Sequence, residues 1–463
     1  MISMESIIQI SVDLARKISK MVDEGELKDL DSLAAHALEE CKRSVKEIIE
    51  IAIQKMNQQL REDKESRKER GWIIHEKDRP REQLTALGLI QWTRDYYYDK
   101  KEGCYITPLD KMIGIEPYAR IGNTVGAELV NAAADMSYAK SADFITGGAV
   151  SRQSVRNQIL RVSVPESQPK EEGKKVKELH IYADEDHVHM QRPGKEKGKQ
   201  NQIVPLVTIT EGTESAGTHR NRTISPVSFV DEDFSGSQLW KTAEGYILRA
   251  YDIDSIGKIY IHGDGGAWIR NGLNGFTQVE HVMDGYHFYK ELRAVARKYP
   301  ARHVQVAITN AIRKDDPKRV EEYLRSLEGA DKTPDKSVCD FQAYLFNNWT
   351  PIRNRLVLKE IPGSCTEGQV SHVLSERFSR NPMGWSREAL GRLSRIRVYR
   401  INGGTITAQM FEKQTDSESY ADYADRLIEE AVTGKLDWSI FEHSRTPFDG
   451  NSGTQHLMRI LCS

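Results

Sequence analysis

Apolar residues recur at helical spacing through residues 1–70 and predict two helices that pair as a hairpin. The first stripe includes Ile10 and Leu14, and the second includes Val45 and Ile49. The polar sides mix both signs of charge, as is typical of helices that pair with one another. We expect this hairpin to pack on its own domain or on a second copy of the chain, with direct DNA contact as the alternative. The length of the stripe favours a homodimer.

Residues 72–110 follow a different pattern, in which aromatic and β-branched runs are split by the sequence DKKEG. This pattern predicts a β-hairpin. Tyr96, Tyr97 and Tyr98 lie together on one of its strands. Exposed rings beside basic residues could stack on bases or sugars. A half-buried strand is the commoner arrangement, and it is the one we expect.

Helical spacing returns in residues 118–162 and includes a candidate helix-turn-helix. One helix is expected over 138–145 and ends at a Gly-Gly pair, and the next begins at Ser151, a residue type that favours helix N-termini. Its first turns could reach phosphates and base edges in a major groove through Ser151, Arg152, Gln153 and Arg156. An ordinary helical hairpin with a Gly-Gly turn explains the pattern equally well. We assign residues 71–163 as a DNA-binding region.

Residues 164–178 are rich in Pro, Glu and Lys without an apolar period, which predicts a linker and the main domain boundary. Beyond it the pattern predicts the order β-β-β-α-β-α-β, which is that of a ribonuclease-H-like sheet. These elements form the first part of an α/β core over 179–285. A charged, all-helical insertion follows over 286–362, and 363–463 completes the core. The expected fold class is therefore an α/β core with a mixed five-stranded sheet, preceded by a mostly helical N-terminal region.

The composition limits the classes of protein to which the chain can belong. The 463 residues include 66 Lys and Arg against 68 Asp and Glu, so the net charge of −2 excludes a uniformly basic DNA-coating protein. No apolar run reaches the length of about eighteen residues that a membrane span needs. Five scattered cysteines without a CxxC pair, and acidic residues where a signal peptide would be basic, favour a reducing cytoplasm.

Three carboxylates form the sharpest chemical pattern. Asp184 and Asp264 end two apolar strand runs, and Glu367 opens a predicted helix. Neighbouring strand ends would bring the aspartates together at one edge of the sheet, and a helix across that edge could add the glutamate. Such oxygen ligands hold Mg²⁺ or Mn²⁺, and two ions suit in-line displacement at phosphorus. The plain alternative is that each carboxylate is simply solvated.

Neighbouring residues leave two further questions open. Asp186 shares a strand face with Asp184 and is an alternate first ligand, while His187 and His189 lie on the other face, where they supply too few ligands for a zinc site. After the fifth strand, His287 could orient a phosphate or a metal-bound water beside Asp284. A capping aspartate with a packed histidine explains that spacing equally well.

The basic stretch 377–400 holds seven arginines against one glutamate. Arginine forks suit phosphates, although a charged run is often only a solvated face. Because this run adjoins the helix that begins near Glu367, we favour contact with the DNA backbone. The candidate contacts are Arg377, Arg380, Arg387, Arg392 and Arg395.

Four segments in this order and spacing resemble the ISLre-type insertion-sequence transposases, a family of the Mutator-like group of DDE transposases. They are DEDHVH, HGDGGAWI, MDGYHFYK and TEGQVSHVLSERFSRNPMGWS. The upstream segments LTALGLIQWTRDYYY and CYITPLDKMIGI resemble the same family, so the likeness covers residues 70–400. The resemblance implies a ribonuclease-H-like catalytic domain, split by a helical insertion before the glutamate, that cleaves and transfers DNA strands with divalent metal.

The resemblance also assigns roles to residues. It places the family's two aspartates on Asp184 and Asp264 and its glutamate on Glu367, with Glu376 on the same helix as an alternate. The Asp-x-x-His signature of the wider group falls on Asp284 and His287. The implied cofactors are two Mg²⁺ or Mn²⁺ ions. The implied partners are double-stranded DNA, at terminal inverted repeats and at the target, and a second copy of the chain.

Two other functions fit the same pattern. A transposase-derived protein without catalysis could bind DNA as a regulator, and a ribonuclease-H-like nuclease could cut without joining. The intact carboxylates favour the active transposase.

Overall fold

The structure is a computed structural model that describes residues 4–23, 29–191, 201–217, 220–328, 335–359, 361, 365–381 and 383–411. The chain divides into two compact units. The first contains Met1–Gly122 and the second contains Asn123–Glu412. Among the described helices, none combines the length and the hydropathy that a membrane span requires.

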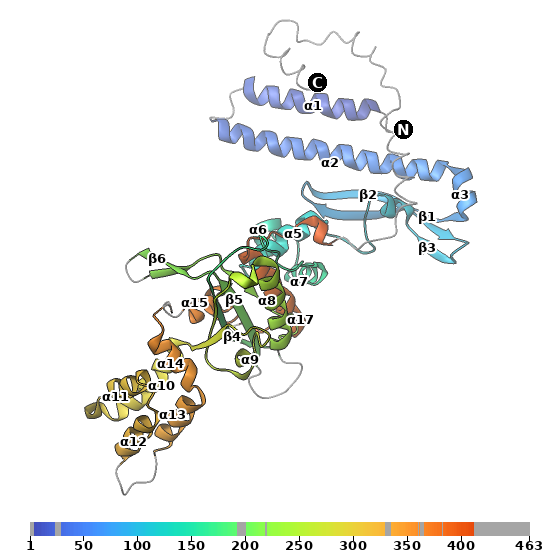
Figure 1. Cartoon of the computed structure of the whole chain (residues 1–463). Helices are drawn as coiled ribbons and strands as arrows, with labels where there is room; N and C mark the ends of the chain where they lie inside the picture. The colour runs from blue at the N-terminus through green and yellow to red at the C-terminus, as the bar shows by residue number, and fades with distance from the viewer. Residues whose placement is uncertain are drawn as a thin grey trace. The chain divides into compact units, whose positions relative to one another are not determined.

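The first unit begins with the expected pair of helices. Helix α1 (Met4–Asp23) lies beside the longer α2 (Leu30–Glu62), and a short helix α3 (Lys64–Arg70) follows (Figure 1). Asp29 caps α2 by accepting a hydrogen bond from the Ser32 backbone, and Lys17 bonds Glu40 across the pair at 2.9 Å. Pairing of this hairpin between two copies of the chain stays a prediction.

A three-stranded antiparallel sheet follows, in the order β1-β2-β3. Its strands are β1 (Trp72–Thr85), β2 (Gly88–Asp99) and β3 (Cys104–Ile106), and a short helix α4 (Pro108–Met112) comes next. Ile53 and Leu60 of α2 pack on Ile90 and Trp92 of β2. The expected hairpin is confirmed, and DKKEG is the turn between β2 and β3. The N-terminal region is therefore less helical than we expected, because long alternating strands occupy 72–106.

The second unit opens with three helices that contact one another, α5 (Asn123–Ala133), α6 (Tyr138–Thr146) and α7 (Arg152–Arg161). The turn between α6 and α7 begins at Gly147, whose φ of 59° favours glycine. These helices share a compact unit with the sheet that follows. The segment 164–178 lies inside that unit, where Lys174 donates its backbone N–H to Ala250. The division at Gly122 thus differs from the boundary that we expected at 164–178.

The central sheet has five strands in the order β10-β9-β4-β5-β8, and its pairing is mixed, as the sequence predicts. Strands β9 and β10 run parallel to β4, whereas β5 lies between β4 and β8 and pairs antiparallel with both. The bounds are β4 (Glu178–His189), β5 (Asn201–Thr210), β8 (Val227–Phe229), β9 (Lys258–Gly263) and β10 (Val279–Met283). A small separate hairpin, β6 (Thr213–Gly217) and β7 (Arg220–Thr223), was not expected.

One face of this sheet is apolar. Leu179, Ile181 and Ile261 point into a core that α8 (Gly236–Ala250) completes with Trp240 and Ile247. A 3₁₀ turn (Ile253–Ser255) and the short helix α9 (Ala267–Arg270) flank it.

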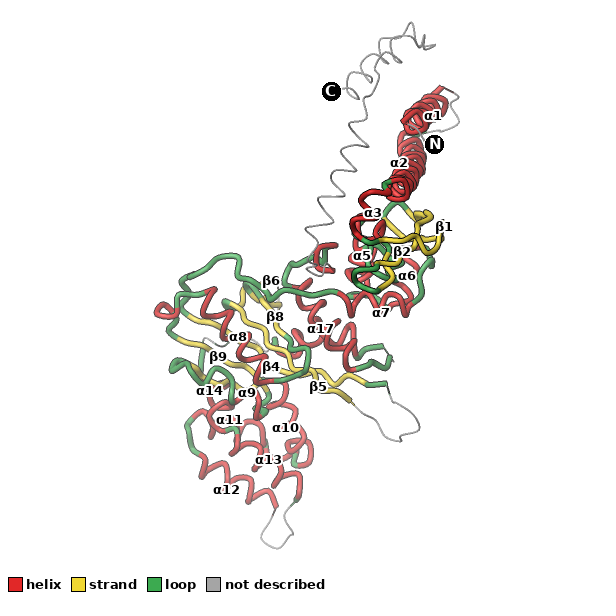
Figure 2. The backbone as a smooth tube through the Cα atoms, turned by 90° about the vertical axis from the view of Figure 1, so that its right-hand side faces the viewer, coloured by secondary structure: helices red, strands yellow, loops and turns green. Residues whose placement is uncertain are grey.

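The insertion after β10 is helical, as expected, and gathers into its own bundle (Figures 1 and 2). Its core includes Phe288, Ile308, Leu324 and Phe341. The amide of Asn354 donates to the His281 carbonyl at 2.9 Å and ties the bundle to β10. The elements are α10 (Gly285–Lys298), a 3₁₀ turn (Pro300–Arg302), α11 (Val304–Arg313), α12 (Pro317–Glu328), α13 (Lys336–Asn347) and α14 (Trp349–Val357).

The last described helices return to the sheet. Helix α15 (Thr366–Val370) runs into a π-helical turn (Ser371–Ser375) and then α16 (Glu376–Phe378), and both α15 and the turn pack on β4. Helix α17 (Arg387–Ile401) and a 3₁₀ turn (Ala408–Phe411) follow. Glycine at position 391 lets α17 pack closely on the backbone at Glu232, because a Cβ on residue 391 would lie 2.2 Å from the Glu232 carbonyl oxygen. The rest of the expected segment 363–463, from 412 onward, lies outside the described residues.

Candidate active site

Three neighbouring strands bring acidic residues to the same edge of the sheet. Strand β4 continues past the end of its pairing with β9, and Asp184 lies on this extension. Asp264 directly follows β9 and Asp284 directly follows β10. The backbone N–H of Asp284 bonds the Gly263 carbonyl at 2.7 Å and keeps the two parallel strand ends together.

The electrostatics of Asp184 show how close these groups lie. Its side chain is buried, and burial raises the pKa of its carboxyl to about 6. The charges of Asp264 and Asp284 contribute to this rise, whereas a hydrogen bond from the Glu185 backbone and the charge of His287 oppose it. The structure therefore gathers Asp184, Asp264, Asp284 and His287 into one cluster.

The turn after β9 holds Asp264 in a fixed place. Its carboxylate accepts a hydrogen bond from the Gly266 backbone at 2.8 Å. Gly265 between them has a φ of +88°, and a Cβ there would lie 2.3 Å from the side-chain oxygen of Asn348. Both the backbone conformation and this close approach require glycine, which accounts for the Gly-Asp-Gly-Gly sequence.

Asp284 has a structural task in addition to its charge. It caps α10 by accepting from the backbones of Tyr286 and His287 at 3.0 and 3.3 Å. The same oxygen lies 3.2 Å from Nδ1 of His287. This bond, opposed by partial burial and aided by Asp184, raises the pKa of His287. Asp284 thus fixes the orientation of the histidine within the cluster.

Asp186 lies apart from the cluster. Its carboxylate accepts from Ser379 at 3.0 Å and from Ser375, so it is bound to the helices that cover β4. Burial raises its pKa, and hydrogen bonds from Ser379 and Ser375 oppose the rise. Of the two candidates for the first ligand, Asp184 is the one whose pKa the charge of Asp264 raises. His187 and His189 are exposed.

Glu367 is exposed on α15. Its alternate Glu376 pairs with His372 and with Arg397, at 3.5 and 3.6 Å. Within the described ranges, no three acidic, histidine or cysteine side chains stand close enough to hold one metal ion. The expected trio is thus brought together only in part. Burial, and then the charges of Glu291, Asp264 and Asp284, raise the pKa of Tyr344. Glu291, one turn beyond His287 on α10, is a carboxylate that the sequence did not single out.

The candidate helix-turn-helix has the expected helices and caps. The Ser151 hydroxyl accepts from the Ser154 backbone at 3.1 Å, so it caps α7. Arg152 and Gln153 on the first turn are exposed. Arg156 is less available, because it pairs with Glu388 of α17 at 3.2 Å.

Arg377 of the basic stretch 377–400 lies inside the protein, and this corrects our expectation for it. Its side chain is only 3% exposed and donates to the Ala133 carbonyl at 3.0 Å, at the end of α5. Its guanidinium lies 4.8 Å from the ring centre of Trp385. Cations at a helix C-terminus stabilise its unbonded carbonyls. Arg377 therefore belongs to the internal framework and is not placed to bind a phosphate.

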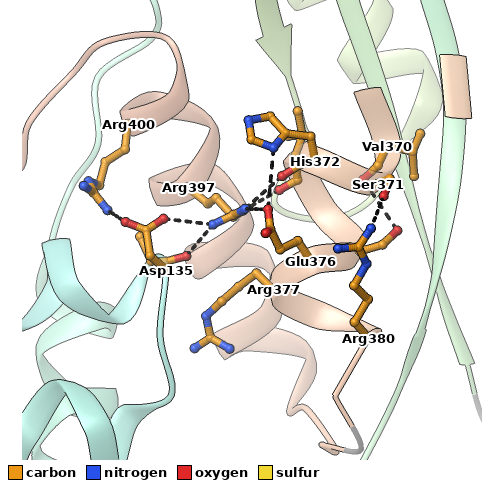
Figure 3. Close-up of polar contacts among 12 residues, drawn as sticks. Asp135, Val370, Ser371, His372, Glu376, Arg377, Arg380, Arg397 and Arg400 are labelled. Carbon is orange, nitrogen blue, oxygen red and sulfur yellow. Dashed lines mark hydrogen bonds and ion pairs between the residues drawn. The ribbon is translucent and has the colours of Figure 1, made fainter. Parts of the chain in front are cut away.

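Arg397 and Arg400 extend this framework, as Figure 3 shows. Both pair with Asp135, and Arg397 also donates to the Ala134 carbonyl at 2.9 Å. Arg397 further bonds the carbonyls of His372 and Val373 in the π-helical turn, at 2.8 and 2.5 Å. These arginines therefore join α5 to the helices that cover the sheet.

The remaining arginines of the stretch are nearer the surface but also have partners. Arg392 and Arg395 both lie near Glu232, at 3.3 and 3.4 Å. Arg380 donates to the Ser371 hydroxyl at 2.7 Å, and Arg387 to the Asp233 carbonyl at 2.8 Å. Any phosphate contact by these four residues would have to exchange or share such partners.

Two features beside the cluster had no local signal in the sequence. The side-chain oxygen of Asn348, from the helical insertion, lies where a Cβ on residue 265 would point. That oxygen has no hydrogen-bond partner among the described residues. On the sheet, His262 bonds His180 at 3.1 Å and stacks on Tyr182. Burial, aided by the charge of His180, lowers the pKa of His262 to about 3.

The chain is similar to several proteins of Caldanaerobacter subterraneus subsp. tengcongensis. One UPF0236 protein, whose name combines eleven locus designations, is 31% identical over 434 residues, covering 92% of this chain and 90% of the relative. Another UPF0236 protein, with four designations in its name, is 32% identical over 390 residues, covering 83% and 80%. The model of the uncharacterised protein family UPF0236 matches residues 22–415. The chain belongs to this family.

Proposed function

We propose that the chain is a DDE transposase, which cleaves DNA strands at the ends of an insertion sequence and joins them to a target. The observation that carries the proposal is the meeting of Asp184, Asp264, Asp284 and His287 at three adjacent strand ends. Ionisable groups with shifted pKa values that converge at one edge of a sheet are typical of catalytic sites.

The donor chemistry of the cluster suits a divalent cation. Asp184 and Asp264 offer hard oxygen ligands, and the pKa of Asp184 is raised mainly by burial and to a lesser degree by the charges of Asp264 and Asp284, which a cation would offset. These two residues would hold Mg²⁺ or Mn²⁺, which supplies electrostatic stabilisation of the charge on the reacting phosphate. We keep Glu367 as the proposed third ligand. Because it does not lie with the others, the proposal requires α15 to bring it in when DNA binds.

His287 would act on the same phosphate. Donation from its Nδ1 to Asp284 leaves Nε2 for a second partner, and the raised pKa favours the protonated ring. A protonated imidazole can donate a hydrogen bond to a phosphate oxygen. Asp284 then serves as the residue that orients and charges the histidine.

DNA would be held at several places. We propose that Ser151, Arg152 and Gln153 on the first turn of α7 meet the element ends, since that turn is exposed. The partly exposed arginines Arg380, Arg387, Arg392 and Arg395 remain candidate backbone contacts. Joining two ends requires two active sites, so we also propose that two copies of the chain assemble on DNA.

The relatives lend support of another kind. The eleven locus designations combined in one relative's name imply that one protein recurs at many places in a single genome. Copying of a mobile element leaves such a record, whereas an ordinary enzyme gene is usually present once or twice.

The test is a cleavage and joining assay on the full-length chain. Labelled duplexes carrying the DNA that flanks the gene, where the proposal expects inverted repeats, are incubated with Mg²⁺ or Mn²⁺ and a target plasmid. We expect nicks at the repeat boundary and covalent joining to the plasmid. Cleavage without joining would favour a nuclease, and tight binding to the repeats with no cleavage in either metal would overturn catalysis.

The position of Glu367 favours a second candidate, a DNA-binding regulator without catalysis. In the described residues the third carboxylate is not assembled with the first two. Glu367→Gln and Glu291→Gln variants decide whether either carboxylate is needed. A regulator predicts that both variants bind the repeats as the unmodified chain does and that none of the three proteins cuts DNA.

A further inference from the structure

An aromatic cluster covers one face of the β1-β2-β3 sheet in the first unit. Side chains alternate along strands, so the central residue of the Tyr96–Tyr98 run, Tyr97, is fully buried with Trp72 and Ile106 on one face. Tyr96 and Tyr98 point to the opposite face, where the β2–β3 register sets Tyr105 beside Tyr98. We call this set of rings, His75, Tyr96, Tyr98 and Tyr105, the aromatic face.

The rings of the aromatic face contact one another. Tyr96 and Tyr105 are stacked, with centroids 5.3 Å apart and planes only 5° from parallel. Tyr98 meets Tyr105 edge-on at 5.2 Å, and His75 lies 4.8 Å from Tyr105. Tyr105 is therefore the central ring, and it comes from an edge strand of three residues.

This cluster is open to solvent. Tyr105 is 50% exposed, and Ile73, which pairs with Tyr98 from β1, is 44% exposed. Contacts between rings stabilise a small sheet, but they do not require the central ring to remain half uncovered. A partner with flat apolar surfaces could cover it.

The charges around the aromatic face narrow the choice of partner. Arg79 lies over the Tyr96 ring, with its guanidinium carbon 5.1 Å from the ring centre. Lys77, Lys100 and Lys101 are exposed in the same strands and turn, against the exposed acids Glu76 and Glu102. Asp78 is engaged by Arg61 at 2.6 Å. The rim is thus moderately basic, which suits a ligand that carries phosphates.

We propose that the aromatic face binds unpaired nucleotides of a DNA strand, with a base stacked on Tyr105 and the backbone near Arg79, Lys100 and Lys101. Every base has a flat face that can stack on tyrosine, but in a duplex those faces are covered by neighbouring bases. The inference of unpaired bases rests on the ring geometry. The choice of DNA over RNA rests on the proposed function.

The test measures binding without cleavage, on the full-length chain in EDTA, by fluorescence anisotropy of a labelled oligothymidine. Tyr105→Ala should weaken binding by about 5- to 100-fold, the range found for loss of one base–aromatic stack. Tyr105→Phe keeps the ring and should bind as the unmodified chain does. The matched control is Tyr118→Ala, which removes a tyrosine of the same unit that is 92% exposed and outside the aromatic face.

A second arm replaces the bases. An abasic strand of the same length keeps all phosphates, so the unmodified chain should bind it more weakly than oligothymidine, whereas Tyr105→Ala should bind the two strands alike. Equal affinity of the unmodified chain for both strands would overturn stacking. Tighter binding to oligouridine than to oligothymidine would overturn DNA as the ligand.

Two controls keep the result interpretable. If Tyr105→Ala lowers the thermal midpoint strongly, His75→Ala tests the same face at an exposed position on the neighbouring strand β1. Asp254→Asn, at an exposed acid outside both the aromatic face and the proposed active site, should bind oligothymidine normally. Unchanged binding by both Tyr105→Ala and His75→Ala would refute the aromatic face while leaving transposition intact. If Tyr105→Ala loses binding while the unmodified chain cuts no DNA in the cleavage assay, the aromatic face is supported and only the proposed transposition is refuted.

Discussion

The two faces of the five-stranded sheet are built from alternate residues of the same strands, yet they are different environments. On β4, Leu179 and Ile181 enter a continuous apolar core beneath α8. Their neighbours Tyr182, Asp184 and Asp186 are also buried, but among histidines, hydroxyls and carboxylates. Burial is therefore common to both faces, and the chemistry of what is buried separates them.

This difference indicates which face serves stability and which serves chemistry. Burying a carboxyl without a full set of partners costs free energy, and Asp184 shows that cost as a raised pKa. Apolar side chains at these positions would give a more stable sheet. A fold that keeps Asp184, Asp186 and His262 there is typical of a functional site.

The largest expected effect is on the polar face, where Asp264→Asn should lose DNA cleavage. The variant keeps the size of the side chain and an oxygen for the Gly266 bond but removes a charged ligand. We expect DNA cleavage to fall at least about a thousandfold, because metal stabilisation is worth several kcal/mol. Rates come from single-turnover assays. Asp254→Asn, at an exposed acid before β9, is the control and should cut normally.

The apolar face should respond in the opposite sense. Ile181→Ala leaves a cavity at a fully buried site and should lower the free energy of unfolding by about 2–5 kcal/mol. Cleavage per folded molecule should change little. Urea titration followed by circular dichroism measures the loss. A variant of normal stability with poor cleavage would show that the two faces are not separate in function.

Arg397 joins the π-helical turn that packs on β4 to the end of α5. Arg397→Ala should therefore lower the free energy of unfolding by about 2–4 kcal/mol. The guanidinium now bonds the carbonyls of His372 and Val373 in the π-helical turn and of Ala134 just after α5, and the change leaves these carbonyls without that partner. Thermal unfolding and the salt dependence of DNA binding should be measured together. A phosphate contact would instead leave stability intact and reduce the slope of binding against salt.

The pH dependence of stability isolates Asp184. A carboxyl whose pKa rises from 3.8 to about 6 on folding favours the folded state fully below the lower value, and this contribution is lost as the pH rises to the higher one. The loss amounts to about 2–3 kcal/mol. In metal-free buffer, Asp184→Asn should therefore gain stability relative to the unmodified chain as the pH rises from about 4 to about 6. A constant difference between the two proteins over that range would contradict the assignment.

The comparison also explains what the sequence could predict. The five strands could be predicted from the apolar pattern, in particular the alternation along β4 and the apolar runs of β9 and β10, because those signals are local and periodic. Asp184, Asp264 and Asp284 could be brought together for the same reason, since parallel strand ends meet at one edge of a sheet.

Long-range packing could not be predicted in this way. Arg377 and the Ala133 carbonyl that it bonds are separated by 244 positions, and nothing local distinguishes this arginine from one on the surface. Asn348 meets Gly265 from another element of the fold, and its neighbours in the sequence give no sign of that contact. The prediction for Arg377 in the basic run 377–400 was wrong because the composition shows the charge but not the carbonyl to which it is bonded.

The smallest expected effect concerns helix α7, which packs on α17. Arg152 is exposed on the first turn of α7, so Arg152→Ala should change the free energy of unfolding by less than about 0.5 kcal/mol. If this arginine contacts a base edge, binding to the inverted repeat should weaken about 5- to 100-fold, and binding to unrelated duplex much less. Arg156→Ala is the internal comparison, because its side chain is shared with Glu388 and its loss should affect both DNAs more evenly. Competition binding at two salt concentrations measures both ratios. Equal losses on repeat and unrelated DNA from Arg152→Ala would limit α7 to the backbone and place sequence reading elsewhere in the chain.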